Sequence, residues 1–483
     1  MKFRKYLRFP VLLFLLGSNL LTASADKKIY LLSDIHVMDS SLVDRPDNKA
    51  WQEDLANNKK MQELSVPIFN QLVETIKEDK PDLLLIAGDL TKDGELVSHD
   101  YVIKKLTEIE SSGIPVYVIP GNHDRGWQEG ARQYKNNTYT SVKYMSENRF
   151  RNYYQPFGYG ESSEVHEKTL SYAAEVLPGL TLIGIDSGQD AHVDDDALVW
   201  CCEKALEARN NGRQVLVMTH HTLIPHFYSQ DFFHPMSVID NQDELVEGLL
   251  DAGVKVALTG HYHVSDITRY TDSQGREIYD ICTGTPLSYP CDYRILTFDD
   301  EYKTLKIATK SITTLEGYTD FPAYTKERMQ TSVYHWASDW LTEHLEHQEV
   351  TDLMSQALSS VFVIHAEGNE PENPGSDAAL LLYDSVVVIS SLFMEDLTML
   401  KSVRLSLRSI LGDYPDENHQ DDVVNDRELT ITMPKVPTSI EHVTTSSETD
   451  AAWYTLQGLR LEGRPTRPGL YLRQGRKVLI GRR

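Results

Sequence analysis

From Lys27 to about Ser311, short apolar runs alternate with longer segments that have helical periodicity. Several of the runs are apolar at every position, which is typical of strands buried on both faces. Amphipathic segments such as Met61–Glu78 and Asp243–Ala252 fall between the runs and predict helices. The pattern therefore predicts an α/β layered fold over residues 26–311. The predicted strands are Ile29–Leu32, Leu83–Ala87, Val116–Ile119, Leu180–Ile185, Val215–Met218, Val256–Leu258, Tyr279–Cys282, Tyr293–Phe298 and Leu305–Thr309.

Regular periodicity fades between Arg125 and Ser171, where tyrosines accumulate. A loop-rich insertion directly after a polar motif is a common place for a wall that faces a substrate. The alternative is a surface excursion whose tyrosines pack against one another, and the sequence leaves both interpretations open. The tyrosines are Tyr134, Tyr139, Tyr144, Tyr153, Tyr154 and Tyr159.

After Ser311 the apolar positions repeat at helical spacing, and we predict a helical accessory domain over residues 312–435. An aromatic stripe such as Trp336 and Trp340 is more often core than the lining of a cofactor pocket. The apolar run Ala378–Met394 is at the lower length limit for a membrane span and contains Asp384, so a buried helix is the better prediction. The positions that carry the helical pattern include Val333, Trp336, Ala337, Trp340, Leu341 and Leu345, followed by Thr351–Ile364 and Leu380–Leu411.

Residues 1–25 have the layout of a secretory signal peptide. Four cations precede an apolar run from Val11 to Leu21, and Ala23-Ser24-Ala25 supplies small residues for cleavage after Ala25. The run is short for an uncleaved anchor, and no cysteine stands at the cleavage point to carry a lipid. The sequence therefore predicts an exported protein that is periplasmic, extracellular or at the cell surface.

The C-terminal end forms a separate unit. Residues 436–452 are rich in Thr and Ser and predict a linker, whereas residues 453–483 carry eight cations and one acid. Apolar residues alternating around glycines in this basic tail predict small strand hairpins. The segment 468–480 resembles the C-terminal sorting tails of secreted Bacteroidetes proteins, which implies contact with the cell envelope or secretion machinery. A plain basic tail is the alternative.

Net charge and cysteine content narrow the choice of ligands. The formal net charge is −25, and it becomes four units more negative once residues 1–25 are removed. A surface this acidic repels nucleic-acid backbones, so no nucleic-acid partner is expected, whereas a metal site can still attract small phosphate esters. Of the four cysteines, Cys282 and Cys291 are the first pair to test for a disulfide, and Cys201-Cys202 fit two small helix residues.

Five polar clusters each follow a predicted strand. The carboxyl ends of strands in an open α/β sheet meet at one edge, so the clusters are expected to converge. Carboxylate, amide and imidazole groups without cysteine suit Mn²⁺, Fe²⁺ or Zn²⁺. The ligands are too many for one tetrahedral ion but suit two ions that together supply a hydroxide and neutralise a phosphoryl oxygen. The clusters are Ser33–His36, Gly88–Thr91, Gly121–Asp124, Thr219–His221 and Gly260–His263.

The order of these motifs resembles the calcineurin-like metallophosphoesterase superfamily. The matching residues are Asp34 and His36, the Gly88–Gly94 run, the Gly-Asn-His-Asp at 121–124, His220, and the Gly-His-Tyr-His at 260–263. The resemblance covers roughly residues 27–311 and implies a two-sheet αββα sandwich, here with a C-terminal helical accessory domain and a short β-hairpin tail.

The resemblance also implies a role for each matching residue. Two divalent metal ions (Mn, Fe or Zn) would share Asp89. His123 would assist the leaving group or steady the transition-state charge, with Asp124 orienting it. Outside the matching positions, His221 could contact the substrate or support its neighbour His220. His226 and His234 could face the site, although a surface loop is the better prediction, and Arg294 could contact a phosphate or form a strand-end salt bridge. The metal ligands would be Asp34, His36, Asp89 and His263 for the first ion, and Asp89, Asn122, His220 and His261 for the second.

Within this superfamily the motifs favour the class III cyclic-nucleotide phosphodiesterase branch. Lys92 stands where purple acid phosphatases have the tyrosine that binds ferric iron. We therefore expect hydrolysis of a small phosphodiester or phosphomonoester. The alternative from another class is a binding or surface-interaction module that retains the fold, which a complete ligand set disfavours.

Overall fold

The computed structural model of the protein describes residues 26–125, 130–228, 230–343, 345, 347–391, 397–412, 425–436, 452–455, 460–461, 463–465, 469–473 and 476–480. The predicted signal peptide, most of the predicted linker and part of the basic tail lie outside these residues.

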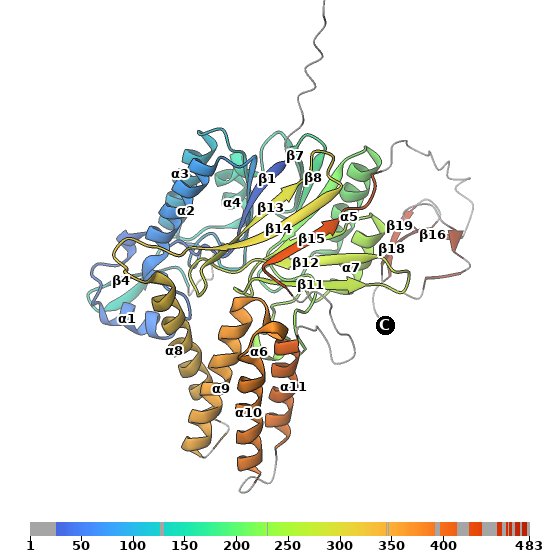
Figure 1. Ribbon diagram of the computed structural model, residues 1–483. Coiled ribbons are helices and arrows are strands. Elements are labelled where there is room, and N and C mark those ends of the chain that lie inside the picture. The colour runs from blue at the N-terminus through green and yellow to red at the C-terminus, as the bar shows by residue number, and fades with distance from the viewer. Residues whose placement is uncertain are drawn as a thin grey trace, which may run out of the picture.

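Two mixed β-sheets form the centre of the molecule (Figure 1). The first sheet has the strand order β15-β14-β13-β1-β2-β3, in which β1, β2 and β3 are parallel and β13 runs antiparallel to β1. Strand β2 is buried at all five positions, as its continuous apolar run predicts. The bounds are β1 (Lys27–Leu32), β2 (Leu83–Ala87), β3 (Val116–Ile119), β13 (Asp292–Phe298), β14 (Thr304–Ser311) and β15 (Glu428–Thr432).

The second sheet has the strand order β11-β12-β10-β9-β8-β7-β6. Strands β8, β9, β10 and β12 run parallel. The edge strand β11 is antiparallel to β12, and at the other end β7 and the edge strand β6 also pair antiparallel. All nine strands predicted from the sequence are present across the two sheets. The bounds are β6 (Ser163–Val165), β7 (Tyr172–Leu177), β8 (Leu180–Ile185), β9 (Gln214–Thr219), β10 (Val256–Thr259), β11 (Asp266–Thr271) and β12 (Glu277–Cys282).

The two sheets pack face to face between layers of helices. In β9, Leu216 and Met218 belong to the core shared with the first sheet, whereas Val215 and Val217 pack with the helices on the outer face. Figure 1 shows α2 and α3 beside the first sheet and α5 and α7 beside the second. The predicted αββα sandwich is therefore confirmed. The bounds of these helices are α2 (Ser65–Asp79), α3 (Leu96–Glu110), α5 (Asp195–Asn210) and α7 (Gln242–Asp251).

Four helices project from one end of the sandwich (Figure 1). They share a core of their own, which Phe227 and Tyr262 of the sandwich join. No described helix combines the length and apolarity needed to cross a bilayer. The prediction of a buried helix at 378–394 is only half right, because Leu381 and Val388 of α10 are 68% and 66% exposed. The bounds are α8 (Phe321–Thr342), α9 (Gln348–Glu367), α10 (Ser376–Ser390) and α11 (Thr398–Gly412).

The helical region does not continue to residue 435 as predicted. After α11 the chain returns to the sandwich, where β15 pairs antiparallel with β14 as an edge strand. The basic tail forms a small four-stranded sheet, as its glycine pattern predicts, and β18 of this sheet packs near α7. The tail strands are β16 (Trp453–Thr455), β17 (Arg460–Leu461), β18 (Gly469–Arg473) and β19 (Arg476–Ile480).

The tyrosine-rich insertion packs mainly on itself and on the core. Tyr154 stacks on Phe150, and Tyr159 lies edge-on to Tyr172. Tyr134 is buried against Trp51. These tyrosines therefore pack with other aromatic side chains, as in the second interpretation, but in the core and not on a surface excursion. The regular elements here are α1 (Lys49–Ala56), β4 (Arg132–Lys135), β5 (Thr138–Ser141) and α4 (Glu147–Tyr153), and α6 (Gln230–Phe233) follows later in the chain.

All four cysteines are buried free thiols. The expected pair of Cys282 and Cys291 is not formed, and the Cys282 thiol instead donates to the Gly260 carbonyl oxygen at 3.3 Å. Cys201 and Cys202 are buried residues of α5, in agreement with the prediction of two small helix residues.

Candidate metal centre

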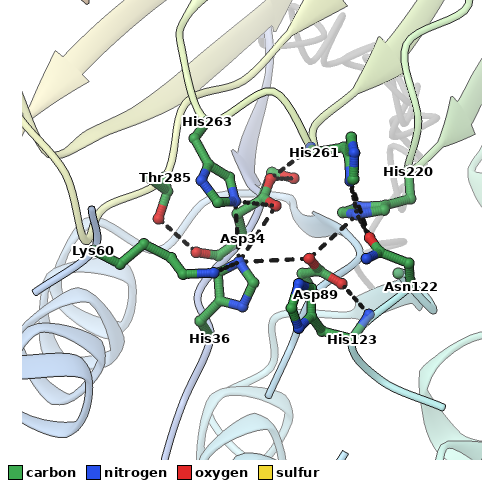
Figure 2. A network of polar contacts seen from close by, with 12 residues as sticks. Asp34, His36, Lys60, Asp89, Asn122, His123, His220, His261, His263 and Thr285 are labelled. Carbon is green, nitrogen blue, oxygen red and sulfur yellow. Dashed lines mark hydrogen bonds and ion pairs between the residues drawn. The ribbon is translucent and has the colours of Figure 1, made fainter. Parts of the chain in front are cut away.

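The five polar clusters meet at one edge of the sandwich. Strands β1, β2 and β3 of the first sheet and β9 and β10 of the second each end directly before one cluster. Because β1–β3 are parallel neighbours, as are β9 and β10, their carboxyl ends lie together. Figure 2 shows the side chains of all seven predicted ligands pointing toward a common centre.

The first group of ligands consists of Asp34, His36, Asp89 and His263. His36 Nε2 lies 3.1 Å from His263 Nε2 and 3.4 Å from Asp89 Oδ2. Asp34 Oδ1 lies 3.1 Å from His263 Nε2 and 3.6 Å from His36 Nε2. Four ligand atoms from three strand ends therefore face one another.

The second group joins Asp89 with His220 and His261, and Asn122 lies among them. Asn122 Oδ1 is 3.0 Å from both His220 Nε2 and His261 Nδ1. His220 Nε2 is 3.4 Å from Asp89 Oδ2, the same oxygen that faces His36 in the first group. Asp89 is thus shared by the two groups (Figure 2).

These spacings fit two divalent cations. Ligand atoms bound to one ion at about 2.1 Å lie about 3.0–3.4 Å apart in octahedral or tetrahedral geometry. The buried Asp34 Oδ1 accepts no hydrogen bond, although its neighbours in the site are basic nitrogens. A buried carboxylate oxygen without a donor is costly, and a bound cation would remove that cost. The residues present therefore fit the two-metal site that the motifs predict.

The ligands sit on unusual backbone. Asp34, His36, Asp89, His261 and His263 all have positive φ, between 38° and 67°. Such conformations cost free energy for residues with a Cβ and persist at functional sites where the surroundings enforce them. Gly121 shows why small residues stand beside the ligands, since a Cβ there would lie 2.1 Å from Asp89 Oδ1.

Burial and neighbouring charges set the protonation of the ligands. Burial, with a smaller effect from Lys60, lowers the pKa of His36 to about 3, so its imidazole is neutral and free to bind a metal. Burial alone would lower the pKa of His220, but Asp89 outweighs it and raises the pKa to about 9. Because His220 Nδ1 lies 2.8 Å from the Ala87 carbonyl oxygen, it is the donor there and Nε2 faces the site.

A surrounding set of hydrogen bonds fixes the first group. The Ser33 hydroxyl and the His261 backbone N–H both donate to Asp34 Oδ2, at 2.6 and 2.9 Å. Thr285 Oγ1 donates to the Asp34 carbonyl oxygen at 2.6 Å, and Gln62 Nε2 donates to the His36 carbonyl oxygen at the same distance. Asp34 Oδ1 is thereby left to face the metal position.

His123 is held by Asp93, so the prediction that Asp124 orients it is wrong. His123 Nδ1 lies 2.8 Å from Asp93 Oδ1, and Lys92 Nζ lies 2.7 Å from Asp93 Oδ2. The oxygens of Asp124 accept instead from the backbone N–H groups of Leu90, Thr91 and Gly121. Asp124 therefore ties two ligand loops together, because the nearby backbone donors capture its carboxylate.

Neighbouring charges favour the protonated form of His123 and the ionised form of Asp93. Burial alone would raise the pKa of Asp93, but His123 and Lys92 outweigh it and lower the pKa to about 2. Burial alone would lower the pKa of His123, yet Asp89 and Asp93 raise it overall. The side chains of His123 and His263 are 33% and 27% exposed, whereas His36 and His220 are fully buried. The centre therefore opens to solvent beside His123 and His263.

The residues with weaker claims lie outside the ligand groups. His221 is buried, and its Nδ1 lies 2.8 Å from the Ser187 hydroxyl, so it supports its neighbour His220. His226 pairs with Asp266, and His234 lies against Tyr262 and Phe362. Arg294 is fully buried and donates to carbonyl oxygens of Cys282 and Asp426, so it forms neither a phosphate contact nor a strand-end salt bridge.

Two residues beside the centre were missed by sequence reasoning. Asp93 stands in the quoted Gly88–Gly94 run, and its proximity to Asp89 was a signal that could have identified it. Lys60 lies outside the motifs, on the loop before α2, and its Nζ is 3.2 Å from His36 Nε2 (Figure 2). Nothing in the sequence around Lys60 marks it, because only the fold brings this loop to the site.

The sandwich is similar to known proteins. Residues 27–265 match the family model described as calcineurin-like phosphoesterase. A dimetal phosphatase from Danio rerio is 13% identical, covers 59% of this chain and 96% of its own, and has a TM-score of 0.41. A purple acid phosphatase from yellow lupin is also 13% identical, with 62% and 53% covered and a TM-score of 0.38. The sulfate thiohydrolase of Thermus thermophilus is 12% identical, with 71% and 68% covered and a TM-score of 0.32.

Proposed function

We propose that this protein, a hydrolase of phosphoric esters whose residues 27–265 match the calcineurin-like phosphoesterase family, cleaves a small phosphodiester or phosphomonoester with two divalent metal ions. The observation that carries the proposal is the pair of ligand groups that share Asp89. Asp34, His36, Asp89 and His263 would hold one ion, and Asp89, Asn122, His220 and His261 the other. Such a pair of ions supplies a hydroxide nucleophile at neutral pH and neutralises phosphoryl charge.

The protein's own residues then position the ester and move a proton. His123 lies at the open side of the centre, where a leaving group would face solvent. Its Nδ1 faces Asp93, so Nε2 is the nitrogen that can donate a proton to the leaving oxygen. Lys92 pairs with the other oxygen of Asp93 and balances part of the charge of this carboxylate.

The proposed substrate is an ester of modest size that the protein meets outside the cytoplasm. The Gly88–Gly94 run and the Gly-His-Tyr-His motif support the cyclic-nucleotide phosphodiesterase branch, and Lys92 speaks against the purple acid phosphatases. The acidic surface disfavours polynucleotides as substrates. The composition of residues 1–25 supports export.

The test is an assay of protein reconstituted with Mn²⁺, Fe²⁺ or Zn²⁺. Nitrophenyl phosphate, bis-nitrophenyl phosphate and cyclic nucleotides are compared, with Asp89→Asn as the inactive control. We expect metal-dependent turnover of at least one ester, with the diesters preferred. A clear preference for the monoester would contradict the phosphodiesterase branch. Turnover that Asp89→Asn leaves unchanged would contradict the proposed site.

A further inference from the structure

A lysine from outside the motifs reaches the metal centre. Lys60 is 9% exposed, and its Nζ lies 3.2 Å from His36 Nε2, an atom of the first ligand group. The His36 ring also neighbours the rings of His123 and His263, with 5.1 Å between centroids in both pairs. The Lys60 ammonium therefore lies at the metal centre, beside a ligand atom of the first group (Figure 2).

The loop before α2 holds this lysine in place. The Met61 backbone N–H donates to the Leu287 carbonyl oxygen at 2.8 Å, and the Lys60 N–H donates to Asn58 Oδ1 at 2.9 Å. After Met61, Gln62 Nε2 donates to the His36 carbonyl oxygen. These hydrogen bonds fix the loop that carries Lys60 beside the metal centre.

The charge of Lys60 is not balanced by a carboxylate in contact. Within the described residues, no carboxylate oxygen lies within ion-pair distance of its Nζ, in contrast to Lys92, which contacts both Asp93 and Asp54. The nearest acids, Asp34, Asp89 and Asp93, act on Lys60 only from a distance, and the first two are metal ligands. Once divalent cations neutralise those carboxylates, the described residues offer the Lys60 ammonium no anionic partner in contact, and a bound anion would supply one.

We infer that Lys60 binds the phosphoryl group of the substrate and donates hydrogen bonds to one of its non-bridging oxygens. This inference rests on the proposed function and adds a substrate-binding residue to it. An anionic phosphoryl group is the ligand whose charge matches the centre, and a flexible ammonium suits it as a point charge. Lys60 is not one of the predicted metal ligands, so its effect on phosphate affinity can be separated from metal binding by measuring the metal content.

The experiment measures binding of inorganic phosphate to Mn²⁺-loaded protein by isothermal titration calorimetry. Binding does not require turnover, so the test is independent of which ester is cut. Lys60→Met is expected to weaken phosphate binding about 10- to 100-fold, the loss of a charge-assisted hydrogen bond, with the metal content unchanged. Lys60→Arg is expected to recover most of the affinity because it restores the cation.

Lys59→Met is the matched control. Lys59 lies on the same loop, but its Nζ is turned to the Trp336 ring, 4.1 Å from the centroid. We expect Lys59→Met to bind phosphate within about twofold of the wild type. Phosphate affinity that survives Lys60→Met would overturn the inference. It would also be overturned if that variant bound an additional Mn²⁺ with phosphate affinity unchanged, since the ammonium would then stand in for a metal.

The outcomes separate the inference from the proposed function. Wild-type protein that binds phosphate through Lys60 but cleaves no ester would contradict the proposed function alone. Metal-loaded wild-type protein that does not bind phosphate would contradict both.

Discussion

At the scale of single residues, Asp93 and Asp124 show how backbone donors decide what a carboxylate does. Both acids stand close to His123 in the chain or in the fold. Asp124 is the sequence neighbour, but three backbone N–H groups of the ligand loops lie within reach of its oxygens and take them. Asp93 is left to pair with the His123 imidazole and with Lys92.

Substitutions of the two acids are therefore expected to have different effects. Asp93→Asn removes the charge that orients His123 and raises its pKa, so kcat should fall about 10- to 100-fold while the metal content stays at its wild-type value. Asp124→Asn should lower the melting temperature and the metal content, since the ligand loops lose their common acceptor. Steady-state kinetics, metal analysis and thermal melts distinguish the two. Wild-type kcat in Asp93→Asn would contradict this assignment.

The ligands themselves could be predicted from the sequence, and their support could not. A polar residue that follows a buried strand lies at the carboxyl edge of the sheet. Asp34, Asp89 and His220 were therefore predictable from the strand ends alone. Lys60 reaches the site from a loop whose position depends on pairing with residues near Leu287. Such contacts between distant segments leave no local pattern in the sequence.

At the scale of elements, a buried polar network joins the helical bundle to the sandwich. The Tyr262 hydroxyl, from the metal-ligand loop after β10, lies 2.8 Å from His365 Nε2 of α9, and the other His365 nitrogen pairs with Glu370. Next to them, His226 Nδ1 lies 2.8 Å from Asp266 Oδ1. The bundle is thus tied directly to a loop that carries His261 and His263.

This network predicts a pH dependence of stability. Burial alone would lower the pKa of His226, but Asp266 and Asp280 outweigh it and raise the pKa to about 10. A histidine whose pKa is raised by folding stabilises the protein fully below its ordinary value of about 6.5, and this contribution is lost as the pH rises through 10. Between these limits the free energy of unfolding should fall by up to about 1.4 kcal/mol per pH unit from this group.

His226→Gln removes that contribution. At pH 6 the variant should be less stable than the wild type by about 3–5 kcal/mol, because Asp266 loses its buried partner. The difference in the free energy of unfolding between the variant and the wild type should become smaller toward pH 10. Urea unfolding of metal-free protein at several pH values measures this. Parallel curves for the two proteins would show that His226 does not carry the effect.

Strand β15 was not predictable, because its pattern follows the helices and its partner lies more than a hundred residues earlier. It pairs with β14 at the edge of the first sheet, and just before it the Asp426 carbonyl oxygen accepts from the buried Arg294. The sandwich is therefore completed by the end of the helical region, and the boundary expected at residue 311 does not separate two independent units.

Two truncations test this contribution of β15. A chain that ends after residue 436 keeps β15. Its melting temperature should therefore be close to that of the full chain, apart from any contribution of the basic tail. A chain that ends after residue 412 loses β15 and an acceptor of Arg294, so its melting temperature should drop by at least about 4 °C. Differential scanning calorimetry provides the comparison. Equal melting temperatures for the two truncations would contradict a structural role for β15.

At the scale of the whole molecule, the two-sheet sandwich belongs to a protein of negative net charge and carries a site suited to metal cations. Apolar strands with helices between them were sufficient to predict an α/β layered fold, whereas the two-sheet arrangement was expected only from the family resemblance. In the structure one core lies between the sheets and another lies under the outer helices of the second sheet. The sequence could not predict how the bundle packs against the sandwich beside the site. The contacts Tyr262–His365 and Lys59–Trp336 join segments that lie far apart in the sequence. The central claim is that this architecture holds two metal ions that share Asp89.

Metal stoichiometry tests that claim most directly. Purified protein loaded with Mn²⁺, freed of excess metal and analysed by inductively coupled plasma mass spectrometry, should contain two ions per chain. Asn122→Ala removes a ligand of the second group only and should retain about one ion, whereas Asp89→Asn, which weakens both groups, should retain fewer than one. Two ions retained in Asp89→Asn, or a fully active wild type with a single ion, would contradict the account.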